Sequence, residues 1–128
     1  MKRTPLRRKS KDPLKKTKDE ADRALQDYCR EIHRGEYCEF CKINPFQVSH
    51  HFIEKSQSNA LRYDLKNLVF ICHECHFSIH RGSKRAIFDL TIRKKRGEEW
   101  SEYILLKARE SVKYYIGDYR KFKEMFTL

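Results

Sequence analysis

Glycine and proline are scarce in this sequence, and long hydrophobic runs are missing from it. Four glycines and three prolines among 128 residues exclude a collagen-like or low-complexity chain. No apolar stretch approaches the roughly 20 residues that span a membrane, and no apolar signal-peptide core follows the basic start. The sequence therefore predicts a cytoplasmic protein without a membrane partner.

Hydrophobic residues are also limited, at 39% of the chain against 37% charged residues. A chain of this length forms one domain, or one small domain with appendages. Its core must be thin, so a disulfide or metal is expected to reinforce it.

Positive charge is concentrated at the start of the chain. Residues 1–18 hold nine of the 29 Lys and Arg residues but one acidic residue, and they supply most of the formal net charge of +11. Such a run repels itself and buries little, which predicts a disordered arm whose partner is a polyanion such as DNA. The alternative is a tail that only keeps the protein soluble. The candidate phosphate contacts in the arm are Lys2, Arg3, Arg7, Arg8 and Lys9.

Four of the five cysteines form two C-x-x-C pairs, Cys38 with Cys41 and Cys72 with Cys75. In a reducing compartment such pairs hold zinc more often than they form disulfides. A two-residue spacer lets both sulfurs reach one ion, and two pairs complete a tetrahedral site. The spacing predicts a structural zinc site, with redox chemistry as the alternative. Cys29 stands apart and is expected to be a buried helix residue.

The hydrophobic pattern predicts helices on both sides of a small sheet. Thr17 and Glu20 form a capping-box pattern that predicts a helix start, and Gly35 suits the stop. Two short strands are expected at 46–50 and 68–71, with a loop over 52–66. A helix should begin at residue 74 or 75 and end at Gly82. The predicted organisation is an arm at 1–18, a helix at 19–36, a zinc-braced module at 37–82 and a helical segment at 83–128.

The histidines between positions 50 and 80 suggest a second metal site. His50 and His51 are neighbours on a strand, so their side chains point to opposite sides. His76 and His80 lie four residues apart on a helix and share a face. Together with His50 they could hold an ion that remains open to substrate, while His51 could accept a proton from water. The alternative is a second structural zinc site.

The combined motif resembles the HNH endonucleases. The resemblance covers residues 38–80: the two C-x-x-C pairs, Val48-Ser49-His50-His51, Asn67-Leu68 and Cys72-His73-Glu74-Cys75-His76 with His80. It implies an α+β fold with a ββα-metal module, a structural zinc and flanking helices. It also implies a single catalytic metal ion and products with 5′-phosphate and 3′-hydroxyl ends.

The same resemblance assigns roles to individual residues. His51 would be the general base, and Asn67 would hold the loop that orients it. His50 and His76 would bind the catalytic ion, with His80 in the place of a further ligand found in colicin-type nucleases. Mg²⁺ or Mn²⁺ is the expected ion, and an all-histidine ligand set also suits Ni²⁺, Co²⁺ or Zn²⁺.

A second resemblance concerns the segment from Asn59 to Asp64, which is similar to the phage NinG (Rap) recombination nucleases. It points to branched or recombination-intermediate DNA, to a phage or mobile element acting in the bacterial host cytoplasm, and to Arg62 as a phosphate contact. An ordinary surface arginine is the alternative for Arg62.

The expected function is therefore metal-dependent hydrolysis of phosphodiester bonds in double-stranded or branched DNA. The alternatives are a zinc-stabilised nucleic-acid-binding module without catalysis and a toxin-like or RNA-directed nuclease. The sequence leaves open whether the protein is a monomer or a homodimer.

Deleting residues 1–18 should weaken DNA binding and flatten its salt dependence, because the number of phosphate contacts sets the slope of log K against log salt. Fluorescence anisotropy with a labelled duplex at several salt concentrations measures that slope. An unchanged slope would contradict a role of the arm in binding.

Overall fold

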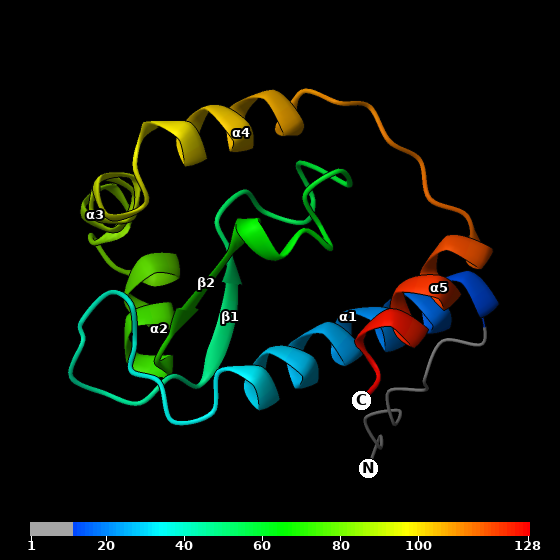
Figure 1. Cartoon of the computed structure of the whole chain (residues 1–128), viewed down its shortest axis with the longest axis horizontal. Coiled ribbons are helices and arrows are strands. Elements are labelled where there is room, and N and C mark those ends of the chain that lie inside the picture. Colours follow the sequence, from blue (N-terminus) through cyan, green and yellow to red (C-terminus); the bar gives the residue numbers. More distant parts are fainter. Residues whose placement is uncertain (1–11) are drawn as a thin grey trace, which may run out of the picture.

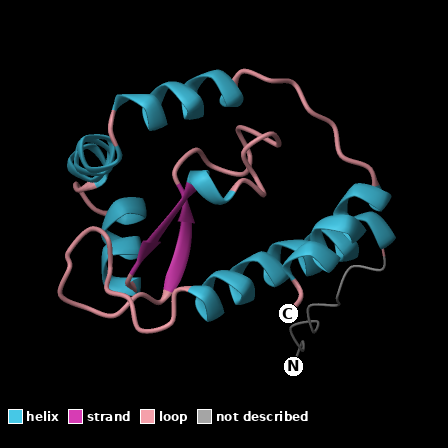
Figure 2. Cartoon of the chain, in the orientation of Figure 1, coloured by secondary structure: helices cyan, strands magenta, loops and turns pink. Residues whose placement is uncertain are grey.

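The computed structural model describes residues 12–128. The five arm residues Lys2, Arg3, Arg7, Arg8 and Lys9 lie outside this range, and their predicted role stays a prediction. Within the described residues the fold comprises five α-helices, one short 3₁₀ helix and one sheet of two strands (Figures 1 and 2). The predicted α+β class with a small two-stranded sheet is confirmed. None of the helices in this part of the chain is long and apolar enough to cross a membrane.

The first helix, α1, spans Pro13–Ile32 and begins earlier than predicted. The Asp12 carboxylate accepts a hydrogen bond from the backbone N–H of Leu14, and proline suits the first helical position. The predicted start at Thr17 was wrong, because the Thr17 hydroxyl donates to the Pro13 carbonyl inside the helix and Glu20 pairs with Lys123. Residues 13–18 are therefore helical, and an arm deletion that leaves α1 intact must end at residue 11.

Two strands form an antiparallel sheet, β1 at Val48–His51 and β2 at Leu68–Ile71. The register pairs His50 with Val69 and His51 with Leu68. β2 has the predicted bounds, whereas β1 begins two residues later than predicted. A 3₁₀ helix, η1, spans Leu65–Asn67 and leads directly into β2.

Helix α2, His73–Arg81, follows β2 immediately. Cys72 caps it, since its Sγ accepts a hydrogen bond from the Cys75 backbone N–H. Gly82 ends the helix as predicted, and a Cβ at this position would lie 2.7 Å from the Ser78 carbonyl oxygen. Close approach to the backbone thus favours glycine at the helix end.

Three further helices complete the chain: α3 at Arg85–Arg96, α4 at Glu98–Ala108 and α5 at Ile116–Phe126. Gly97 separates α3 from α4 with φ +90°, a value that side chains disfavour. α5 returns to lie beside α1 along one edge of the molecule, while α2 lies next to the sheet (Figure 1).

The core consists of two clusters that meet at the sheet. One joins α1 to α5 around Leu25, Cys29 and Tyr119, with Leu68 from β2. The other lies around Val69, Ile71 and Ile79 and includes cysteines of both C-x-x-C pairs. Burial of Cys29 in α1 is as predicted. Because β2 supplies side chains to both clusters, the sheet is held between α1 on one side and α2 with α3 on the other.

Candidate metal centre and active site

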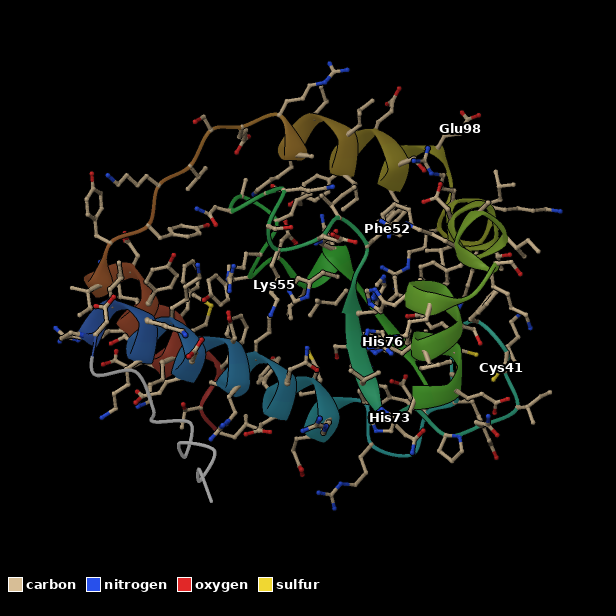
Figure 3. All side chains as sticks on the ribbon, turned by 180° about the vertical axis from the view of Figure 1, so that it is seen from behind. Cys41, Phe52, Lys55, His73, His76 and Glu98 are labelled. Atoms are coloured by element: carbon tan, nitrogen blue, oxygen red, sulfur yellow. The ribbon has the colours of Figure 1, made fainter. Side chains whose placement is uncertain are left out.

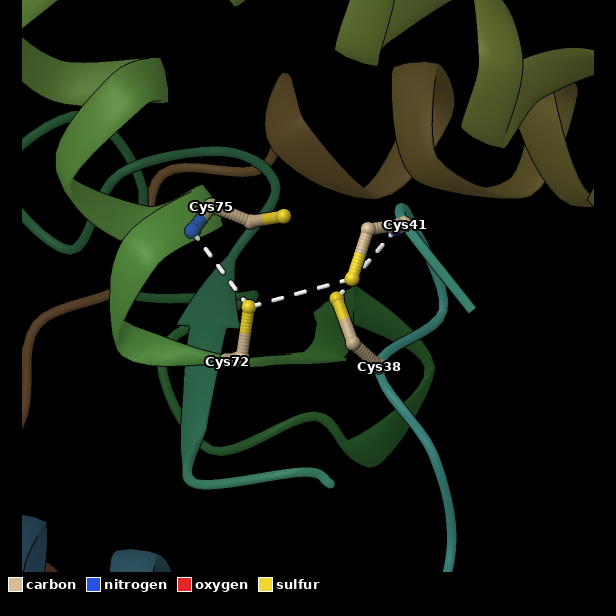
Figure 4. Close-up of side chains that lie close together, drawn as sticks. All are labelled: Cys38, Cys41, Cys72 and Cys75. Carbon is tan, nitrogen blue, oxygen red and sulfur yellow. Dashed lines mark hydrogen bonds between the residues drawn. The ribbon is translucent and has the colours of Figure 1, made fainter. Parts of the chain in front are cut away.

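The four cysteines of the C-x-x-C pairs come together where the first pair meets the start of α2 (Figure 4). Their Sγ atoms all lie within 4.8 Å of one another, and the Sγ atoms of Cys41 and Cys72 are 3.9 Å apart. Two sulfurs at corners of a tetrahedron, each about 2.3 Å from a zinc ion, would be about 3.8 Å apart. The cluster therefore has the donor set and spacing of a structural zinc site.

Backbone groups around the cluster favour thiolate ligands. The Cys41 and Cys75 N–H groups donate to the sulfurs of Cys38 and Cys72, and the Asn44 side chain donates to Cys72. The backbone N–H of Asn44 lowers the pKa of Cys41 to about 7. Burial and the neighbouring sulfurs raise the pKa of Cys75, and a bound cation would offset this by stabilising the thiolate.

His50, His76 and His80 form a second cluster. His50 comes from β1, and His76 and His80 come from α2. One ring nitrogen of each lies within 4.8 Å of the others, and the Nε2 atoms of His76 and His80 are 3.0 Å apart. Two ligands about 2.1 Å from one ion are roughly 3 to 3.4 Å apart, so this spacing fits a shared ion. Figure 3 shows His76 on α2 next to strand β1. The structure thus brings the three predicted ligands together.

The surroundings of His50 and His76 favour the neutral imidazole. Burial, with added repulsion from His76 and His80, lowers the pKa of His50 to about 3. Burial also lowers the pKa of His76, with His80 contributing. A metal ligand must present an unprotonated nitrogen, so no proton has to leave His50 at neutral pH before an ion binds.

His51 is not part of the three-histidine cluster, because neighbouring side chains on a strand leave it in opposite directions. Its Nε2 lies 2.8 Å from the carbonyl oxygen of Arg62. A carbonyl only accepts hydrogen bonds, so Nε2 carries the proton and Nδ1 is left as an acceptor. Burial lowers the pKa of His51, although the Arg62 carbonyl opposes this shift, and the ring is therefore neutral at pH 7.

Asn67 makes hydrogen bonds to two other residues of the loop between the strands. The side chain is fully buried. Its Oδ1 accepts from the Ile53 N–H at 2.9 Å, and its Nδ2 donates to the Ile53 and Leu61 carbonyls at 3.0 and 3.2 Å. The two ends of the loop are therefore fastened to each other directly beside His51 and Arg62.

A cleft of about 590 Å³ opens over these histidines. It is lined by His50, His51, His76 and His80, by residues 54–56 and 62, by Val48 and Ser49, and by Lys18 and Gln26 of α1. Lys55 lies on the loop after β1 (Figure 3). Two lysines thus border a cleft that contains both the candidate ligands and the candidate base.

Arg62 lines this cleft but is not the free phosphate contact that the sequence suggested. Its side chain is 8% exposed, and its guanidinium makes two hydrogen bonds to the Asp22 carboxylate of α1. Sequence reasoning overlooked Asp22 and Gln26. Asp22 and Gln26 lie four residues apart on α1, next to the buried residues Ala21 and Leu25. From sequence alone this polar pair looks like part of a solvent-exposed helix face.

Residues 36–82 match the family model of the HNH endonucleases. The matched segment begins just before Cys38 and ends at Gly82, so it contains both cysteine pairs, all four histidines of the cleft and Asn67. It covers the sheet and α2 but neither α1 nor α3 to α5. The comparisons with curated proteins and with solved structures give no match.

Replacing Cys38 with serine should remove one thiolate ligand and abolish the cooperative unfolding of residues 36–82, because structural zinc supplies folding free energy. The thiolate charge-transfer absorption of the Co²⁺-loaded protein reports this site without interference from histidine ligands. A thermal melt recorded by circular dichroism reports stability.

The matched control is Cys29→Ala, which removes a buried thiol outside the cluster. It should keep the Co²⁺–thiolate band while lowering the melting temperature modestly. Wild-type absorption and a wild-type melt for Cys38→Ser would contradict a four-cysteine metal site.

Proposed function

We propose that this chain is a metal-dependent endonuclease that hydrolyses phosphodiester bonds in DNA, with His51 as the general base. The observation that carries the proposal is the hydrogen bond from His51 Nε2 to the Arg62 carbonyl, beside a three-histidine cluster in the same cleft. The bond leaves Nδ1 as the one ring nitrogen that can accept a proton. Base and metal ligands are thus separate side chains on adjacent residues.

In the proposed reaction, His51 Nδ1 takes a proton from a water molecule as its oxygen attacks the phosphorus atom. A bond forms between the water oxygen and phosphorus, and the bond from phosphorus to the 3′ oxygen breaks. The departing 3′ oxygen takes a proton from solvent, which leaves 5′-phosphate and 3′-hydroxyl ends. Asn67 contributes by keeping the loop that carries the Arg62 carbonyl closed against β1.

His50, His76 and His80 would hold the divalent ion, which would supply positive charge beside the phosphate in the transition state. Mg²⁺ and Mn²⁺ are the first candidates, and imidazole ligands also accept Ni²⁺, Co²⁺ or Zn²⁺. The low pKa of His50 supports this role, because its nitrogen is available at any physiological pH.

DNA as the substrate is supported by charge as well as by the family match. The chain carries a net charge of +11, and Lys18 and Lys55 border the cleft. Residues 59–64 are similar to phage recombination nucleases, and on that basis we propose branched DNA as a substrate. The same similarity leads us to propose that the protein is encoded by a phage and acts in the host cytoplasm. A monomer that cuts one strand and a homodimer that cuts two are both compatible with the proposed active-site cleft.

Replacing His51 with alanine should lower the rate of plasmid nicking by about 10²- to 10⁴-fold, since a positioned general base contributes this much. Protein with its cysteine-bound zinc retained and other metals removed is assayed with Mg²⁺, Mn²⁺ or Ni²⁺ added one at a time. Supercoiled plasmid and a four-way DNA junction serve as substrates.

His73→Ala is the control, because His73 lies on the same helix as His76 but is exposed and outside the three-histidine cluster. It should keep wild-type activity. If wild type binds both substrates and cleaves neither with any ion, the protein is a zinc-stabilised binding module and the nuclease proposal fails.

A further inference from the structure

Asp22 of α1 contacts several residues of the loop that follows β1, including Lys55 at 3.9 Å. Its carboxylate accepts hydrogen bonds from Arg62 Nε at 3.1 Å, from Arg62 Nη2 at 2.5 Å and from the Tyr63 hydroxyl at 2.8 Å. Burial, together with Asp22, raises the pKa of Tyr63, so the phenol keeps its proton and donates it. Two adjacent loop residues are thus fastened to one carboxylate.

These contacts fix the group to which His51 is bound. The Arg62 carbonyl that accepts the His51 Nε2 proton belongs to the same residue whose guanidinium Asp22 holds. A movement of residues 62 and 63 away from α1 would carry this carbonyl with it. The position of the acceptor therefore depends on Asp22.

The donor side of the same hydrogen bond is fastened to α1 as well. Gln26 donates from Nε2 to the Ser49 carbonyl at 2.8 Å and accepts from the Ser49 N–H at 3.1 Å. Ser49 lies two residues before His51 on β1, and Gln26 lies one helical turn after Asp22. One rigid helix face thus sets the distance between the His51 ring and the Arg62 carbonyl.

We infer that Asp22 is a positioning residue for His51: through Arg62 and Tyr63 it holds the carbonyl that keeps the proton of His51 on Nε2 and leaves Nδ1 free. This inference rests on the proposed function, in which Nδ1 accepts a proton from water. It extends the active site to α1, which lies outside the matched residues 36–82.

A purely stabilising ion pair would also weaken the protein when broken, so stability and positioning have to be separated. Asp22→Asn leaves the Arg62 cation buried without its anionic partner, which destabilises a folded protein. The double variant Asp22→Asn with Arg62→Met removes that unpaired charge as well. We expect it to recover thermal stability but not the position of the carbonyl.

The direct readout is the Nε2–H proton of His51 in a ¹H–¹⁵N NMR spectrum of the zinc-loaded protein at pH 8, assigned by its loss in His51→Ala. In wild type the hydrogen bond should protect this proton from exchange with water, so its signal is visible. We expect the signal to disappear in Asp22→Asn and to stay absent in the double variant. In both, kcat for DNA nicking should fall roughly 10- to 100-fold with KM changed less than about twofold.

Asp27→Asn is the matched control, because Asp27 is an exposed aspartate of the same helix and pairs with Arg30. It should leave the His51 signal and the nicking rate unchanged. Retention of the signal in Asp22→Asn, or recovery of signal and kcat together with stability in the double variant, would overturn the inference. The NMR readout needs no activity, so an inactive wild type would refute the nuclease proposal without deciding the role of Asp22.

Discussion

The four-cysteine cluster is the contact on which the candidate active site depends. It joins the loop at 38–41 to the residue that caps α2, and it lies in the same buried cluster as β2 and α3. α2 is thereby fixed against the sheet, which places His76 and His80 opposite His50 of β1. A helix of nine residues with few apolar contacts of its own would not keep that position without such a brace.

The second constraint is the alternation of side chains along β1. It lets His50 serve as a candidate metal ligand while its neighbour His51 serves as the candidate base. His50 points into the three-histidine cluster, and His51 contacts the Arg62 carbonyl on the other side. Each side has its own support: the cysteine cluster and α2 for the metal ligands, and α1 with Asn67 for the base. The candidate site is therefore assembled from the segment that matches the family model, residues 36–82, and from a helix that precedes it.

Local patterns in the sequence predicted most of the site, because its chemistry is encoded in short spacings. The C-x-x-C pairs, the adjacent histidines and the i, i+4 pair on α2 each specify geometry over a few residues, as do the bounds of β2. The predicted start of α1 was wrong because Asp12 and Pro13 cap the helix four residues before Thr17. The role of Arg62 was misjudged because its partner Asp22 lies 40 residues earlier, and no local pattern encodes a contact of that kind.

Anomalous diffraction from crystals of the zinc-loaded protein soaked in Mn²⁺, with data collected at both absorption edges, tests the central claim most directly. The account predicts a zinc peak among the four cysteine sulfurs and a manganese peak among the ring nitrogens of His50, His76 and His80, with His51 in contact with neither. A manganese peak bound to His51, or no peak at the three histidines under conditions in which the protein cleaves DNA, would contradict it.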